Sequence, residues 1–532
     1  MALRVLSAAL VAVHGMVAVA DPVFPDPADH RAALGGQPQS FSLSSTLGSH
    51  MVLQRAPASA VVWGFAPPGT VVRTTFDSAG YAATAGEDRI WRIALAPTPA
   101  GGPHAMTFEA STGEKAVLED VLFGDVYVCG GQSNMQFAVG GNEEADSYRR
   151  EADSYPDVRL FTVGQGTSSP APLTDLRTIE QKWARASNAS VSNGDAFSYF
   201  SAVCWFFGKQ VHRKLGGKVP IGLISNNWGG TRIEQWMPTE TSEPCGHPST
   251  GELYNAMIVP YTVGPMAVSG FTWYQGESDL GGDPNLPDQN SNYTCTQTAM
   301  INLWRQKFAV PDAFFAVVIL STWFPGAPGN YLLPQLRDQQ VASGASLKNF
   351  AYASNADYGF GGDIHPIFKQ HAGARLANAA LSIVYGQPVN WRSPSYASAS
   401  ETGNGELTVK LDDVTDAGLT LRSVANVNAN LRLEDCPAKN KELPRSCAWA
   451  DLQFDDAGKT WVNATVALGA DKTTIVLRAT PPSGATKILA SAYGWGAVPM
   501  LTVYRADMDG EDGQLPVLTW NRSLEAKTLL VV

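Results

Sequence analysis

Residues 125–135 read DVYVCGGQSNM, a short apolar run followed by two glycines and a serine. The β-branched and aromatic residues of this run predict a buried strand, and the glycines predict a turn where the strand ends. Ser133 is therefore expected at a strand exit, with its hydroxyl held clear of the sheet. A hydroxyl beside backbone N–H groups has the position that a covalent nucleophile needs, although many serines at such exits only cap a turn.

The segments around this strand predict an α/β core. Apolar runs at 125–129, 219–224, 268–274, 314–320 and 350–353 predict strands, and patterns at 199–212, 296–308 and 371–384 predict helices. This alternation favours a doubly wound parallel sheet, whose chemistry is expected at the carboxyl ends of the strands. Short β-like runs with Pro/Gly turns at 39–119, and alternating runs beyond residue 387, predict flanking all-β, sandwich-like domains. The expected division is a signal peptide at 1–20, a β-sandwich domain at 21–120, the α/β domain at 121–390 and a C-terminal β-rich domain at 391–532.

Composition and the first residues bear on partners and location. The 532 residues carry a formal net charge of −11, which argues against nucleic acid and anionic membranes as partners. The apolar stretch at 6–20 ends in Ala-Val-Ala, which is typical of a cleaved secretory signal peptide. It is shorter than the ~20 residues that span a bilayer. We therefore expect a protein of the secretory pathway, extracellular or lysosomal.

The six cysteines fit the same interpretation. None lies in a zinc-ligand spacing, so disulfides are expected and no metal is. Cys436 and Cys447 are close enough to bridge one loop, while the other four, Cys129, Cys204, Cys245 and Cys295, could pair in three ways. Sequons at Asn188, Asn292, Asn463 and Asn521 make glycosylation possible.

Two more segments follow apolar strands and carry polar groups. Residues 221–234 read IGLISNNWGGTRIE, where Gly229 and Gly230 would let a backbone N–H approach a ligand. Residues 273–279 read WYQGESD, where the Gln275 amide could donate to a developing oxyanion. A turn without a ligand is the simpler reading of the first segment. Glu277 and Asp279 in the second leave open a glycosidase with two carboxylates.

The last segment, GGDIHP at 361–366, places one of only eight histidines in a loop before a predicted helix. Asp363 lies two residues before His365, which makes His365 a candidate general base. A solvated loop histidine is the alternative. His371 is expected on the helix surface, and its separation from His365 is poor for a shared metal.

Together these segments resemble the sialate O-acetylesterase family within the SGNH-hydrolase superfamily. The resemblance covers most of the chain, and several motifs in the expected order are more specific than any one of them. They are MVLQR at 51–55, GQSNM at 131–135, WGGT at 228–231, LYNAMI at 253–258, WYQGES at 273–278 and IHP at 364–366.

The resemblance implies acyl transfer to a serine, without a metal or organic cofactor. Ser133 would be the nucleophile and His365 the base. The Ser133 N–H, Gly229 or Gly230, and Gln275 would form the oxyanion hole. Many members of the superfamily place the acid three residues before the histidine, where this chain has Gly362. Asp363 is therefore favoured as the acid, with Asp357 as the alternative.

The resemblance also implies an O-acetylated sialic acid as substrate. Its carboxylate would need a guanidinium, and Arg232 and Arg337 are the candidates, each of which could instead be a structural arginine. An esterase of other acetylated glycans, such as acetylated xylan, is the nearest alternative. A catalytically inert glycan-binding protein is an alternative of a different class.

Overall fold

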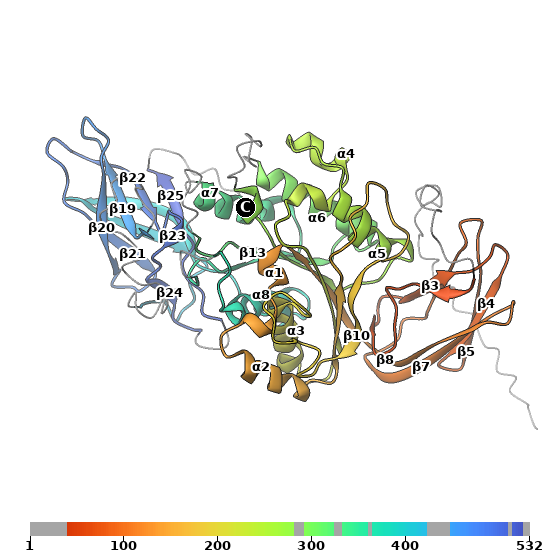
Figure 1. Cartoon of the computed structure of the whole chain (residues 1–532). Coiled ribbons are helices and arrows are strands. Elements are labelled where there is room, and N and C mark those ends of the chain that lie inside the picture. Colours follow the sequence, from red (N-terminus) through yellow and green to blue (C-terminus); the bar gives the residue numbers. More distant parts are fainter. Residues whose placement is uncertain are drawn as a thin grey trace, which may run out of the picture.

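The computed structural model describes residues 40–280, 292–323, 332–359, 364–422, 447–508 and 513–524. Three regions follow one another along the molecule: an N-terminal β region, a central α/β region and a C-terminal β region (Figure 1). The expected signal peptide at 1–20 lies outside the described residues.

The central sheet has the strand order β10-β9-β11-β8-β12-β13-β14, and each neighbouring pair is parallel except β10 with β9. Its strands are β8 (Lys115–Gly131), β9 (Val158–Val163), β10 (Ile179–Arg185), β11 (Ile221–Asn227), β12 (Gly270–Tyr274), β13 (Phe314–Ile319) and β14 (Phe350–Ser354). From β9 to β14 the parallel strands are buried along their whole length, as expected for a sheet covered on both faces. The predicted α/β class is confirmed.

Helices cover both faces of this sheet. In Figure 1, α2, α3 and α8 lie on one side, and α5, α6 and α7 lie on the other. The helices are α1 (Ser133–Gln136), α2 (Ala145–Glu151), α3 (Ala202–Lys214), α4 (Thr239–Ser242), α5 (Val259–Val263), α6 (Tyr293–Lys307), α7 (Leu332–Ala342) and α8 (Lys369–Ile383). The three predicted helices correspond to α3, α6 and α8.

The strand register brings three sequence-predicted segments to one edge of the sheet. Gly131, the last residue of β8, is paired with Asn227 on β11 and with Tyr274 on β12. The serine turn, the double glycine and Gln275 follow these three strands directly. They therefore leave the sheet side by side at its carboxyl edge, where ligands bind in open α/β sheets.

Strand β8 joins two regions. Its first half pairs with β2 and β7 of the N-terminal region, and its second half pairs with β11 and β12, so the expected boundary at residue 120 falls inside one strand.

The N-terminal strands are β1 (Ser42–Leu43), β2 (Val52–Gln54), β3 (Val61–Phe65), β4 (Val71–Phe76), β5 (Ala79–Thr84), β6 (Ile90–Ala94) and β7 (Gly101–Ala110). The β1-β3-β6 sheet packs on the β4-β5-β7 side through Trp91 and Phe108, whose rings are 5.6 Å apart. The described N-terminal region is therefore all-β, as the sequence predicts.

The C-terminal region is all-β in its described part. A seven-stranded antiparallel sheet has the order β15-β16-β21-β20-β19-β22-β25, and the pairs β17–β24 and β18–β23 lie beside it. The strands are β15 (Ser395–Gly403), β16 (Glu406–Asp412), β17 (Leu419–Leu421), β18 (Cys447–Ala448), β19 (Ala450–Phe454), β20 (Trp461–Leu468), β21 (Thr474–Arg478), β22 (Ile488–Tyr493), β23 (Val498–Pro499), β24 (Val503–Arg505) and β25 (Trp520–Ser523). The region has an apolar core of its own, built largely from inward residues of these strands.

Two disulfides select one of the three pairings left open by the sequence. Cys129 on β8 is bonded to Cys204 on α3, and Cys245 is bonded to Cys295 on α6. The first bond fixes the strand that leads to Ser133 against a covering helix. The expected bridge between Cys447 and Cys436 involves a residue outside the described ranges.

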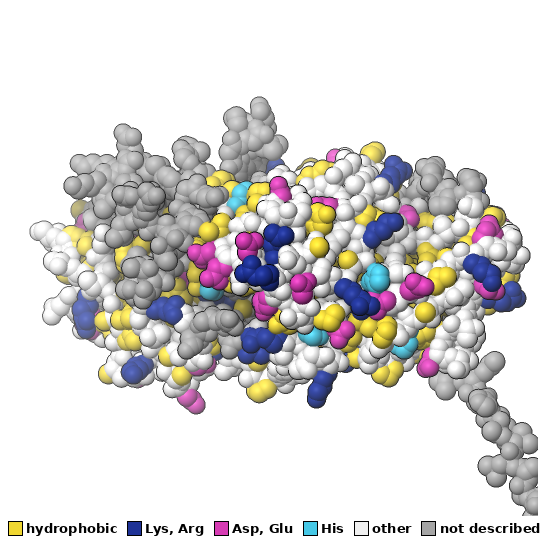
Figure 2. Space-filling view, turned by 60° about the horizontal axis from the view of Figure 1, so that its bottom comes forward, with side chains coloured by type: hydrophobic (Ala, Val, Ile, Leu, Met, Phe, Trp, Pro, Cys, Tyr) yellow, Lys and Arg dark blue, Asp and Glu magenta, His cyan; other side chains and the backbone are white. Residues whose placement is uncertain are grey.

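The molecular surface in Figure 2 shows acidic and basic side chains interspersed over the face presented. Among the described residues, no helix combines the length and apolar character needed to cross a bilayer.

Candidate active site

Ser133 is the first residue of α1, directly beyond the end of β8. Two backbone hydrogen bonds fix this turn: Gln132 N–H donates to Tyr274 O, and Trp228 N–H donates to Gly131 O, both at 3.0 Å. Gly131 has φ +142°, and a Cβ built there would lie 2.2 Å from Tyr274 O. Only glycine allows this close approach, which holds the half-buried serine between β11 and β12.

The double glycine lies beside the serine, as the sequence predicts. A Cβ built on Gly229 would lie 3.1 Å from the Ser133 Cβ. The Gly229 N–H, however, donates to the Oε1 of Gln136 at 3.0 Å. Gly230 has φ +75° and faces open space. In this arrangement the Gly229 N–H already has an acceptor, so it would have to exchange Gln136 for an oxyanion.

The Gln275 side chain is fully buried, and its hydrogen bonds are internal. Its Nε2 donates to Thr231 O at 3.0 Å, to Gln132 Oε1 at 3.2 Å and to Asp279 Oδ2, while its Oε1 accepts from Tyr293. An amide nitrogen has only two hydrogens, and these acceptors occupy them. The prediction that Gln275 donates to the oxyanion is not met in this structure. The side chain instead supports the serine turn through Gln132.

His365 lies next to the helix that carries Ser133. Its ring packs between Phe137, at 6.5 Å and nearly parallel, and Phe197, at 5.0 Å and edge-on. The backbone carbonyl of the preceding residue, Ile364, accepts a hydrogen bond of 2.9 Å from the Asn134 side chain. The structure thus brings the histidine loop against the serine turn, although the two lie more than 200 residues apart.

Asn134 is the centre of a buried polar network that the sequence reasoning did not identify. Its Nδ2 donates to Glu277 Oε1 at 2.5 Å as well as to Ile364 O, and its Oδ1 accepts from the Lys369 ammonium. Lys369 begins α8, is fully buried and lies 4.7 Å from the centre of the Phe137 ring. Every hydrogen-bonding group of the Asn134 amide is used, so this residue links the serine turn, β12 and the histidine loop. Its position inside the GQSNM motif was the one available signal.

Glu277 should make the stability of the protein depend on pH. Burial raises the pKa of this carboxyl from its ordinary 4.5 to about 7, and Asn134 and Lys369 oppose the shift. Between these two pH values the folded state holds a proton that the unfolded chain has released. The free energy of unfolding should therefore fall as pH rises from about 4.5 to about 7.

Glu277→Gln is expected to flatten this slope, because an amide carbonyl can still accept from Asn134 but does not titrate in this range. Urea unfolding of both proteins at pH 5 and pH 8 measures the effect. An equal loss of stability in both proteins between the two pH values would contradict the assignment.

The two acidic residues of the WYQGESD segment do not form a glycosidase pair. Glu277 is bonded to Asn134, and Asp279 accepts from the Ile233 N–H at 3.2 Å and from Gln275. Both side chains are buried, with exposed fractions of 5% and 2%. Carboxylates that act on a glycosidic bond must face the sugar, and these two face the protein interior.

Of the two candidate acids, Asp363 lies outside the described residues. Asp357, the alternative, is fully buried in a bidentate ion pair with Arg375, both hydrogen bonds being 2.7 Å long. Tyr504 of the C-terminal region also donates to it, at 3.3 Å. The Asp357 carboxylate is therefore engaged with partners other than His365, and the structure assigns it to the junction between the α/β and C-terminal regions.

Arg337 is wrong as a substrate clamp. It is 2% exposed and donates to the backbone carbonyls of Leu320, Ser321, Gly496 and Ala497 at 2.8 to 3.0 Å. These contacts tie α7 and β13 to the C-terminal region. Four of its five N–H groups are donated to backbone carbonyls and the side chain is buried, which leaves no room for a carboxylate ligand. Sequence alone could not distinguish this structural arginine from a ligand-binding one.

Arg232 lies nearer the serine turn, directly after Thr231. Its Nε is 2.9 Å from Glu234 Oε1, and its side chain is 18% exposed. Burial and the nearby Asp279 raise the pKa of Glu234 to about 7, whereas Arg232 lowers it. Arg232 therefore already has an acidic partner, although part of its side chain reaches solvent.

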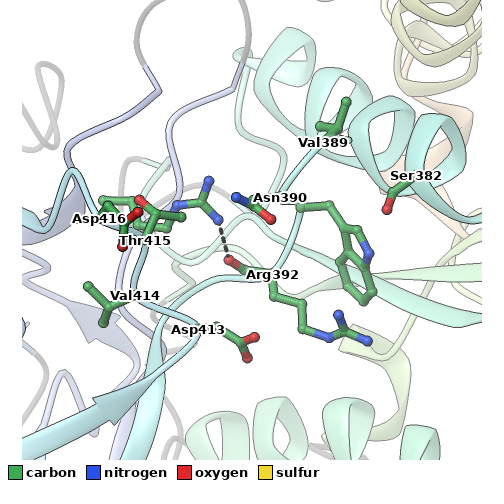
Figure 3. Close-up of a pocket in the computed structure, with 10 residues that line it drawn as sticks. Ser382, Val389, Asn390, Arg392, Asp413, Val414, Thr415 and Asp416 are labelled. Carbon is green, nitrogen blue, oxygen red and sulfur yellow. Dashed lines mark hydrogen bonds between the residues drawn. The ribbon is translucent and has the colours of Figure 1, made fainter. Parts of the chain in front are cut away.

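A separate cavity of about 420 Å³ lies where the chain passes from α8 into the C-terminal region (Figure 3). Trp391, Arg392 and Asp413 are among its lining residues, and Arg505 donates to the carbonyl of Arg392 at 3.0 Å. Neither Ser133 nor His365, the predicted catalytic residues within the described part of the chain, lines it.

Comparisons with known proteins agree with this geometry and define the class as a carbohydrate esterase. The family description "carbohydrate esterase, sialic acid-specific acetylesterase" matches residues 123–382. The structure is similar to a carbohydrate acetylesterase from Xanthomonas citri, with a TM-score of 0.72 and 26% identity over 90% of this chain and 99% of that one.

Proteins of similar sequence place the chain in a particular family of carbohydrate esterases. The chain is 33% identical to a sialate O-acetylesterase of Pongo abelii, over 68% of this chain and 73% of the relative. It is 32% identical to that of Homo sapiens over the same shares, and 31% identical to that of Mus musculus over 65% and 74%. The chain belongs to the sialate O-acetylesterase family, which confirms the resemblance found in its motifs.

Proposed function

We propose that the protein hydrolyses O-acetyl esters of sialic acids through an acyl-enzyme on Ser133. The observation that carries the proposal is the convergence of Ser133, the Gly229 turn and His365 at the carboxyl edge of one parallel sheet. Membership in a family named for this activity supports the substrate class. The SGNH assignment of the core belongs to the same proposal.

In the proposed mechanism His365 removes the Ser133 proton as the serine oxygen attacks the acetyl carbonyl. The first N–H groups of a helix have no partners within it, so those at the start of α1 can stabilise the oxyanion, together with the backbone at 229–230. The protonated His365 then gives its proton to the departing sugar hydroxyl. Water, activated by the same histidine, finally releases acetate from Ser133. Asp363 is the proposed acid that orients His365.

A second candidate is an esterase of neutral acetylated glycans, and it is favoured because both arginines proposed as carboxylate ligands already have partners in the protein. Arg337 is enclosed by backbone carbonyls, and Arg232 is paired with Glu234. Neither is poised to bind a carboxylate in this arrangement, and a neutral sugar would not require it.

Substrate comparison separates the two candidates. Acetate release from O-acetylated sialic acid, acetylated xylan and a small aliphatic acetyl ester should favour the sialate by at least about tenfold in kcat/KM. Arg232 would have to exchange Glu234 for the sialate carboxylate, and if it does so, Arg232→Ala should reduce that preference while sparing the neutral esters. A preference for acetylated xylan would support the serine mechanism but assign a different substrate. If no acetate were released from any of the three esters, an inert glycan-binding protein would be favoured.

We also propose that the protein enters the secretory pathway. The apolar residues at 6–20 and the two disulfides support this location, since such bonds persist in oxidising compartments. The four sequon asparagines are at least partly exposed, as glycosylation would require.

A further inference from the structure

We propose that Phe197 and Tyr199 form an aromatic platform that stacks against the pyranose ring of the acetylated sugar. This inference rests on the proposed esterase function and adds to it the surface that recognises the leaving group. It assigns a substrate-binding role to residues outside the motifs that define the family.

Exposure is the first observation. In the described part of the chain, five large hydrophobic side chains are strongly exposed, and two of them lie two residues apart: Phe197 at 36% and Tyr199 at 38%. Isolated apolar residues on a surface are ordinary, so the position of these aromatic residues relative to the site has to carry the inference.

Position is the second observation. The Phe197 ring lies 5.0 Å from the His365 imidazole and 5.4 Å from the Phe137 ring, measured between centroids. Its backbone carbonyl accepts from the Gln136 amide at 3.1 Å, and Gln136 also binds the Gly229 N–H. The Phe197 ring, part of which is exposed, is thus adjacent to both the proposed base and the serine helix.

The platform is held in place by its backbone. Ala138 N–H donates to Ala196 O at 2.8 Å, and Tyr199 N–H donates to Glu180 Oε1 at 2.6 Å. Tyr199 has φ +70°, an unfavourable conformation for an aromatic residue. Such strain persists only where the surroundings impose it, and it is most common at functional sites. The backbone that carries Phe197 and Tyr199 is therefore held by the surrounding structure and does not have to be ordered by the substrate.

The chemistry fits a sugar ring. When the acetyl carbonyl is at Ser133, the departing oxygen must lie near His365, so the sugar that bears it extends past this histidine. A pyranose presents C–H groups on its face, and flat amphipathic aromatic rings provide rigid contact area at little entropic cost. An acetyl ester without a ring would gain nothing from the platform.

The test uses the full-length protein and its Phe197→Ala, Phe197→Tyr, Tyr199→Ala and Trp449→Ala variants. For an acetylated pyranoside, Phe197→Ala and Tyr199→Ala should each lower kcat/KM by about tenfold, mainly through KM. The loss on an aliphatic acetyl ester should be several times smaller. Phe197→Tyr should restore most of the pyranoside activity. Trp449, exposed to 40% on the C-terminal region, is the matched control, and its variant should match the wild type on both esters.

A binding measurement separates this inference from the esterase proposal. In the Ser133→Ala background, calorimetry with the acetylated pyranoside should show a dissociation constant about tenfold weaker when Phe197 is also replaced by alanine. That result supports the platform even if the parent protein releases no acetate. Equal fold-losses on ring and aliphatic esters, or unchanged pyranoside binding in the double variant, would overturn it.

Discussion

Replacing Ser133 by alanine is expected to lower acetate release by at least about a thousandfold, with KM little changed. Without the hydroxyl no acyl-enzyme can form, and only binding and oxyanion stabilisation remain to assist water. Among the described residues, the Ser133 hydroxyl makes no hydrogen bond, and the side chain is half-buried. Its removal should therefore leave the free energy of unfolding within about 0.5 kcal/mol of the wild type.

Two further variants complete this measurement. His365→Ala should reduce turnover to a similar extent, since a nucleophile and its base act as one unit and their losses do not add. Ser278→Ala is the matched control, because this half-buried serine also follows a strand of the central sheet. Retention of more than a tenth of the activity in Ser133→Ala would contradict the covalent mechanism.

The positions of Ser133 and His365 could be predicted because short local patterns mark them. Ser133 follows a predicted strand, and His365 lies in a loop before a predicted helix. A strand exit is visible as an apolar run followed by glycine, and the parallel register then aligns all such exits at one edge. The edge strand β10 escaped prediction because its sequence IEQKWAR is polar and only partly buried, so it lacks the apolar run of a central strand.

The roles of Gln275 and Arg337 could not be predicted, for a different reason. Each is decided by acceptors that the fold supplies from far along the chain, such as Thr231 for the first and Gly496 for the second. A motif tells which groups a residue carries, but it does not tell how many of them the interior already uses. Counting donors against acceptors in the structure is what distinguishes a ligand-binding side chain from a structural one.

Asp357 is the structural residue whose replacement should have the largest effect on stability. Asp357→Ala should lower the free energy of unfolding by about 3 to 5 kcal/mol, because it leaves the fully buried Arg375 guanidinium without its counter-charge. Arg375 also donates to Gln514 O at 2.8 Å, so the loss should loosen the contact between the α/β and C-terminal regions. Urea unfolding measures the change.

The double variant Asp357→Leu/Arg375→Met should recover much of that loss, because it removes both charges and refills the space with apolar groups. Asp363→Ala, by contrast, should lower turnover by a hundredfold or more with little effect on stability, as expected for the residue that orients His365. The opposite outcome would assign the acid to Asp357: Asp357→Ala would keep wild-type stability and lose turnover, while Asp363→Ala would keep wild-type turnover. The pair of measurements thus assigns the two carboxylates separately, one to catalysis and one to the junction between regions.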